Sequence, residues 1–105
     1  MAKVPVAIER SVRRFLEMAG KERRNSAAYV YGSYVRGTAT EWSDIDVAVV
    51  SPDFTGDMFT AQLALMQLAA RIDGRIEPRA FAPEDFNVSN PLASAIQRTG
   101  ILVTS

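Results

Sequence analysis

Two short groups of polar residues interrupt an otherwise apolar stretch of the chain between Tyr29 and Pro52. Gly32-Ser33 ends one apolar run, Ser43-Asp44-Ile45-Asp46 opens the next, and Gly37 lies between them. A glycine turn lets the backbone approach a phosphate closely, and two neighbouring carboxylates can hold a divalent cation. The stretch therefore indicates phosphate and metal chemistry between two buried strands.

Asp44 and Asp46 stand two residues apart at the start of a strand that we expect over residues 44–50. Successive side chains of a strand point to opposite faces, so the two carboxylates share one face. Adjacent anions raise each other's pKa unless a cation lies between them. Mg²⁺ or Mn²⁺, which prefers oxygen ligands, removes that conflict and can bind substrate phosphates as well.

The Gly32-Ser33 turn supplies the phosphate side of the same site. Ser33 is placed to cap a short helix expected over residues 34–39, whose first amides point outward, and its hydroxyl can also donate to a phosphate. A phosphate cradle beside a metal site is what nucleotidyl transfer needs. A simpler interpretation makes Gly37 a helix stop and the aspartates a cap and a surface pair, but the joint spacing favours the functional interpretation.

The composition excludes several other kinds of site. The 105 residues contain no cysteine and no histidine, which excludes disulfides, thiolate and imidazole metal ligands, and histidine-based triads. Twelve Lys and Arg balance twelve Asp and Glu, whereas direct nucleic-acid binding usually needs a basic excess. We see no membrane-length apolar run and no signal-peptide pattern, and expect a cytoplasmic protein with one domain over residues 1–105.

The expected elements place this motif in an α/β (α+β) fold, a small mixed sheet flanked by helices. We expect helices over residues 8–24, 34–39, 58–72 and 92–98, and strands over 27–31, 44–50 and 75–81, with 101–103 as a last strand or a strip packed on the core. Pro78 predicts either that residues 75–81 form an edge strand or that the strand ends near this proline. In the helix over 58–72, the expected apolar stripe consists of Phe59, Leu63, Met66 and Ala70, and it is widened by Leu65, Leu68 and Ala69.

The pattern Gly32-Ser33-x3-Gly37-x5-Ser43-Asp44-x-Asp46 resembles the signature of the DNA polymerase beta-like nucleotidyltransferase superfamily. The short chain is similar to the minimal nucleotidyltransferase (MNT) branch of that superfamily. The resemblance implies that Asp44 and Asp46 are metal ligands and catalytic residues. It also implies an ATP site, for which we assign Gly32, Ser33, Arg36, Gly37 and Ser43.

The superfamily also has a third carboxylate on a later strand, which completes the metal site and can take the proton of the attacking hydroxyl. Glu77 is the candidate by position, and Asp73 is its rival in the preceding turn. Glu77 has a second interpretation as an edge-strand residue paired with Arg75 or Arg79.

Four residues near the motif are less clearly assigned. Arg36 and Arg79 either contact a nucleotide or partner or are solvated. Tyr31 is expected in the core, and Tyr34 and Trp42 are expected in packing or surface positions.

The resemblance implies Mg-dependent transfer of a nucleoside monophosphate, AMP from ATP, to a hydroxyl acceptor. Proteins similar to the MNT branch often act as antitoxins beside a HEPN-type partner, a tyrosine of which would then be the acceptor. The alternative is a catalytically weak or inactive MNT domain that acts as a partner-binding antitoxin or regulatory module. An edge strand on a small core is compatible with a homodimer or with a complex between different proteins.

Overall fold

The computed structural model describes residues 4–22, 27–40, 42–54 and 56–103 of the chain. Its strands form one sheet in the order β3-β2-β1-β4. They are β1 (Ala27–Tyr31), β2 (Ile45–Val50), β3 (Ile76–Phe81) and β4 (Ile101–Leu102). β1 is antiparallel to both β2 and β4, and β2 is parallel to β3. The predicted mixed sheet is confirmed, with β3 at its edge.

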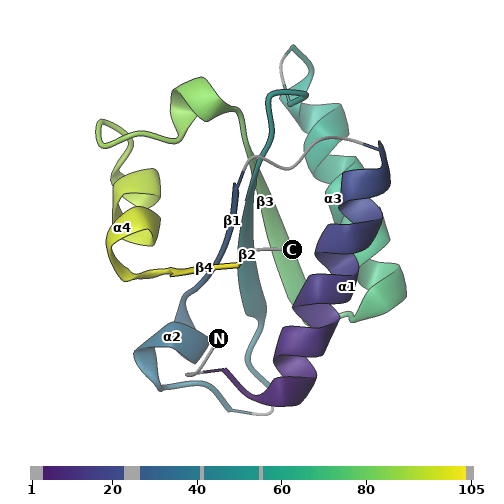
Figure 1. Ribbon diagram of the computed structural model, residues 1–105, viewed down its shortest axis with the longest axis vertical. Coiled ribbons are helices and arrows are strands. Elements are labelled where there is room, and N and C mark those ends of the chain that lie inside the picture. Colours follow the sequence, from purple (N-terminus) through teal and green to yellow (C-terminus); the bar gives the residue numbers. More distant parts are fainter. Residues whose placement is uncertain (1–3, 23–26, 41, 55, 104–105) are drawn as a thin grey trace.

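Helices lie on both faces of this sheet (Figure 1). The helices that cover one face are α1 (Val6–Glu22) and α3 (Met58–Ile72). The opposite face carries α4 (Pro91–Thr99), preceded by the 3₁₀ turn η1 (Pro83–Asp85), while α2 (Ser33–Arg36) follows β1 directly. Within the described ranges, no helix has the length and apolar character needed to cross a membrane.

The short helix α2 begins and ends at different residues than the sequence predicted. α2 is a single turn because Gly37, with φ 77°, adopts the left-handed conformation that ends it. Gly32 caps this helix and no side chain caps it, so the predicted capping role of Ser33 is wrong. α1 continues through Gly20, and its expected extension to Arg24 lies outside the described residues.

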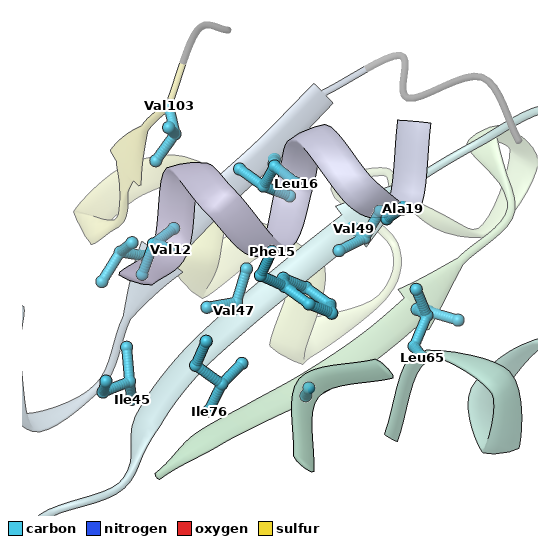
Figure 2. Packing of buried hydrophobic residues seen from close by; sticks show 14 of the residues in the cluster. Val12, Phe15, Leu16, Ala19, Ile45, Val47, Val49, Leu65, Ile76 and Val103 are labelled. Carbon is cyan, nitrogen blue, oxygen red and sulfur yellow. The ribbon is translucent and has the colours of Figure 1, made fainter. Parts of the chain in front are cut away.

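The larger hydrophobic core lies between the sheet and the pair α1 and α3 (Figure 2). Val12 and Phe15 of α1 are fully buried, as is Val47 of β2. A buried side chain of this size contributes about 1.5–3 kcal/mol to folding. This face supplies a firm support for the sheet and leaves the other face available for chemistry.

α3 turns a different side to the core than its periodicity predicted. The side chains that are buried on α3 are Ala61, Leu65 and Ala69. The stripe expected in the core is exposed instead: Phe59 at 77%, Leu63 at 43%, Met66 at 51%, and Ala70 as well. The prediction is wrong for the central stripe, because apolar residues surround most of this helix, but Leu65 and Ala69 at its widened margin are buried as expected.

The outer edge of β3 is capped by the side chain of Gln62. The Gln62 amide nitrogen donates to the Pro78 carbonyl at 2.7 Å, and its Oε1 accepts from the Ala80 N–H at 2.8 Å. An edge strand otherwise presents unpaired backbone groups. Gln62 therefore stands in for a further strand and holds β3 in position beside β2.

The turn between α3 and β3 is closed by Asp73. Its carboxylate accepts hydrogen bonds from the Arg75 backbone N–H at 3.0 Å and from the Arg75 guanidinium at 3.0 and 2.8 Å. These bonds, with a smaller contribution from Ser11, lower the pKa of Asp73 to about 2 although burial opposes the shift. The Arg75 carbonyl then accepts from the Ile45 N–H at 2.7 Å, so this turn fixes the start of β2.

We predict that Asp73→Asn lowers the free energy of unfolding near pH 7 by about 1–2 kcal/mol, since Arg75 is partly exposed and solvent weakens the pair. The folded pKa lies below the unfolded value, so the stabilisation is present above about pH 4 and disappears as the pH falls toward 2. Urea unfolding of wild type and variant between pH 7 and pH 3 measures it, with the exposed Asp85→Asn as control. A difference that does not shrink with falling pH would contradict the assigned ion pair.

Candidate active site

A polar row crosses the sheet on the face opposite α1 and α3. Tyr31 of β1 is paired with Asp46 of β2, and Asp46 is paired with Glu77 of β3. Residues paired in register share one face of a sheet, so these three side chains lie next to one another. The same face is covered farther along by α4, which packs on a cluster that includes Val50 and Phe81. α4 thus covers one part of the face and leaves the polar row accessible.

Asp46 lies directly against the Gly32 turn. A Cβ atom added at Gly32 would overlap Oδ2 of Asp46, and Gly32 also has a φ of 81°, which side chains with a Cβ rarely adopt. Residue 32 must therefore be glycine if Asp46 is to keep its place. The two halves of the motif, the glycine turn and the carboxylates, are in contact in the folded protein.

The electrostatic environment of Asp46 disfavours its negative charge. Burial raises the pKa of Asp46 most, the nearby carboxylates of Asp44 and Glu77 raise it further, and Arg36 lowers it in part. Asp46 therefore carries its negative charge in a partly buried position beside two further carboxylates. A bound cation would remove this cost.

The donor set fits Mg²⁺ or Mn²⁺, because Asp44, Asp46 and Glu77 offer only carboxylate oxygens. Asp44 lies one residue before β2 and is exposed, as is Glu77. Among the described residues, no three acidic side chains converge closely enough to form a complete metal cluster. Asp44 and Glu77 are exposed, so neither carboxylate is held in place by packing.

Two cavities meet at Tyr31 and Asp46, which line both of them. The β3 cavity, of about 480 Å³, is lined further by Glu77, Arg79 and Gln62 and by an apolar group of side chains: Met58, Phe59, Pro78 and Ala80. The α4 cavity, of about 260 Å³, lies between the glycine turn and α4. Its other lining residues are Gly32, Arg36, Leu92, Ala95, Ile96 and Thr99. Asp46 can therefore contact groups bound in either cavity.

Tyr31 belongs to this site, although the sequence led us to expect it in the core. It is half-buried, and burial followed by the charge of Asp46 raises the pKa of its hydroxyl, whereas the charge of Arg79 and a hydrogen bond from Arg79 lower it. Arg79 thus lies beside the candidate site. Along β1 the buried Ala28 and Val30 alternate with Tyr29 and Tyr31, which puts Tyr31 on the face opposite the main core. The strand is apolar throughout, so the sequence alone did not show which of its residues face that core.

The structure brings together only part of the predicted set of site residues. Gly32, Arg36 and Asp46 line one cavity, and Glu77 lines the other with Asp46. Arg75 forms its ion pair with Asp73 and not with Glu77. The rival carboxylate in the turn is therefore already paired with Arg75.

The remaining predicted nucleotide-binding residues have structural contacts but line neither of these two cavities. Ser33 begins α2, and Gly37 ends it. Ser43 accepts a hydrogen bond from the Thr40 N–H at 2.8 Å through its hydroxyl oxygen and so closes the loop before Asp44. Their roles in nucleotide binding stay predictions. In the same region Tyr34 is buried, and Trp42 is 85% exposed.

Known proteins resemble this chain in sequence pattern and in fold. The sequence model of a family described as nucleotidyltransferase domain matches residues 9–87. The structure is similar to the crystal structure of a candidate nucleotidyltransferase from Sulfolobus solfataricus, with a TM-score of 0.58 and 21% identity over 97% of this chain and 89% of that chain. At this identity the similarity shows the fold. No curated protein matches the chain.

We predict that Gly32→Ala weakens Mn²⁺ binding at least about 10-fold, because the new methyl group displaces Asp46. The positive φ adds a cost of about 1–2 kcal/mol to folding. Gly74→Ala is the matched control, since Gly74 has open space for a methyl group. Calorimetric titration with Mn²⁺ and thermal unfolding separate the two effects. A folded variant with wild-type Mn²⁺ affinity would argue against Asp46 as a ligand.

Proposed function

Because the chain belongs to the nucleotidyltransferase domain family, we propose that it transfers a nucleoside monophosphate, AMP from ATP, to a hydroxyl acceptor. We further propose that the reaction depends on Mg²⁺ or Mn²⁺ and takes place in the cytoplasm. The observation that supports this most strongly is the position of Asp46. It contacts the glycine turn, pairs with Glu77, and lines both cavities.

The metal would be held by Asp44, Asp46 and Glu77. When bound, such an ion neutralises phosphate charge and the leaving pyrophosphate and acidifies the attacking hydroxyl. The conflict between like charges around Asp46 is consistent with this role, since the apo site is unfavourable for a carboxylate.

The donor nucleotide is assigned to the α4 cavity. Gly32 contributes a turn without a side chain, and Arg36 provides a positive charge at the same cavity. A guanidinium matches the geometry of phosphate oxygens and pairs with them through two hydrogen bonds. Ser33, Gly37 and Ser43 complete the predicted nucleotide-binding set.

The acceptor is assigned to the β3 cavity, on the other side of Asp46. The acceptor oxygen forms a bond to the α-phosphorus of ATP, the bond from that phosphorus to the bridging oxygen breaks, and pyrophosphate leaves. Glu77 lines this cavity and takes the proton of the acceptor hydroxyl. Arg79 and the Tyr31 hydroxyl lie beside it and can orient the acceptor.

We also propose that the protein is an MNT-type antitoxin whose acceptor is a tyrosine of a HEPN-type partner. The exposed apolar stripe on α3, formed by Phe59, Leu63 and Met66, supports a protein partner, because exposed apolar groups that line up on one helix face are typical of interaction surfaces. Phe59 also lines the β3 cavity, so a protein bound to the stripe would lie next to Glu77.

Two variations of this proposal use the same stripe. In one, the domain has lost catalysis and neutralises its partner by contact alone. In the other, the stripe joins two copies of this chain as a homodimer. Catalysis is favoured over the first because Asp44, Asp46, Gly32 and a third carboxylate are all present.

The site is tested by calorimetric titration of ATP with and without Mg²⁺. We predict binding in the micromolar to millimolar range that needs Mg²⁺ and is lost in the double variant Asp44→Asn/Asp46→Asn, because the metal ligands are gone. Glu84→Gln/Asp85→Asn, two exposed acids on η1 outside both cavities, is the matched control. Folded wild-type protein that binds no ATP at any Mg²⁺ concentration would overturn the proposal.

The partner is tested with a HEPN protein encoded beside this chain and ATP labelled at its α-phosphate. We predict that label appears on a tyrosine of that protein, and that Leu63→Glu reduces labelling at least about 10-fold by placing a charge in an apolar contact, without changing ATP affinity. Gln67→Glu, exposed on the same helix, is the matched control. A stable complex without labelling would favour the non-catalytic module.

A further inference from the structure

The α4 cavity has two walls of different chemistry. One wall is formed by the glycine turn with Arg36 and by Asp46. The opposite wall consists of four α4 side chains, three of them hydrocarbon: Leu92, Ala95, Ile96 and Thr99. None of these four side chains carries a charge, so this wall offers no positive group to pair with a triphosphate.

The α4 wall is firmly positioned. The Asn90 side chain caps the helix by accepting from the Leu92 and Ala93 N–H groups at 3.1 and 3.2 Å. Ala93 and Ile96 are buried against the sheet, and the Gln97 amide donates to the Phe86 carbonyl at 3.2 Å. A wall fixed at its start, middle and end can discriminate between ligands by shape.

This wall also lies outside the part of the chain that the family model matches. The match ends at residue 87, and α4 begins at Pro91. The polar wall thus comes from the portion shared with the family, whereas the hydrocarbon wall comes from a segment beyond it.

We propose that α4 binds the nucleoside part of the donor and that Ala95 determines whether a nucleoside fits. This inference rests on the proposed function, because it takes the α4 cavity as the donor site. A nucleoside presents a flat ring with apolar faces, which pack well on hydrocarbon side chains, while its phosphates reach Arg36 across the cavity. Ala95 has the smallest side chain of the wall and is only half-buried, so it leaves the space that the nucleoside occupies.

The Thr99 side chain favours the same arrangement. Its hydroxyl donates to the Ala95 carbonyl at 2.7 Å within the helix. The donor capacity of Thr99 is therefore already used, and the hydroxyl oxygen presents an acceptor toward the cavity. An acceptor suits the N–H and O–H donors of a nucleoside and is unfavourable beside a phosphate.

The experiment compares two ligands, ATP and inorganic tripolyphosphate, each titrated with Mg²⁺ into variants of the full chain. Ala95→Leu and Ala95→Phe fill the cavity by increasing amounts, and Ala95→Ser leaves it open. We expect ATP affinity to fall progressively and by at least about 10-fold in Ala95→Phe, with tripolyphosphate affinity changed less than about 2-fold. Ala7→Phe makes the same change at an exposed position of α1 and should alter neither ligand.

Each other outcome overturns a definite statement. Unchanged ATP affinity in folded Ala95→Leu and Ala95→Phe would show that α4 does not contact the nucleoside. Equal weakening of both ligands would show that this wall faces the phosphates. Wild-type protein that binds tripolyphosphate as tightly as ATP would show that no nucleoside site exists. Wild-type protein that binds neither ligand would overturn the proposed function itself, and the inference with it.

Discussion

The crowding of negative charge around Asp46 is the constraint on which the rest of the structure depends. Asp46 is half-buried between a turn that has no side chain and a strand that brings Glu77 alongside. Such an arrangement lowers the free energy of unfolding, and interactions outside the site must offset this loss. The support comes from the opposite face, where α1 and α3 bury the main core, and from the Asp73 turn, which fixes the start of β2 through Ile45. Stability and chemistry are thus assigned to opposite faces of one small sheet.

The partial cover on the second face has its own consequence for the site. α4 packs over the end of the sheet that carries Val50 and Phe81 and reaches the polar row only at Tyr31 and beside Asp46. The row consequently separates two cavities rather than lying in one cleft, and Tyr31 and Asp46 form their common boundary. Two substrates that must react with each other can approach such a boundary from different sides, which suits a transfer reaction better than a single-substrate reaction.

Strong local signals made much of the fold predictable. β1 was bounded by polar residues and Gly32, and α4 by Asn90 and Pro91, and both appear where those residues predicted them. The exposed stripe of α3 was not predictable from periodicity, because the helix is apolar on most sides and only its neighbours decide which side is buried. The position of Tyr31 at the site depends on pairing with Asp46, a contact between strands that the sequence motif alone does not specify. The role of Glu77 follows from register in the same way.

The Gln62 side chain also bears on how this chain can associate with others. Sheets with bare edges tend to polymerise, because each edge can recruit another strand. In this protein the edge at β3 is already bonded to Gln62 through Pro78 and Ala80, and the edge at β4 spans only two residues. Growth of the sheet from one molecule into the next is therefore disfavoured at both edges. If two molecules associate through the exposed apolar surface of α3, their sheets are not expected to join into a fibre.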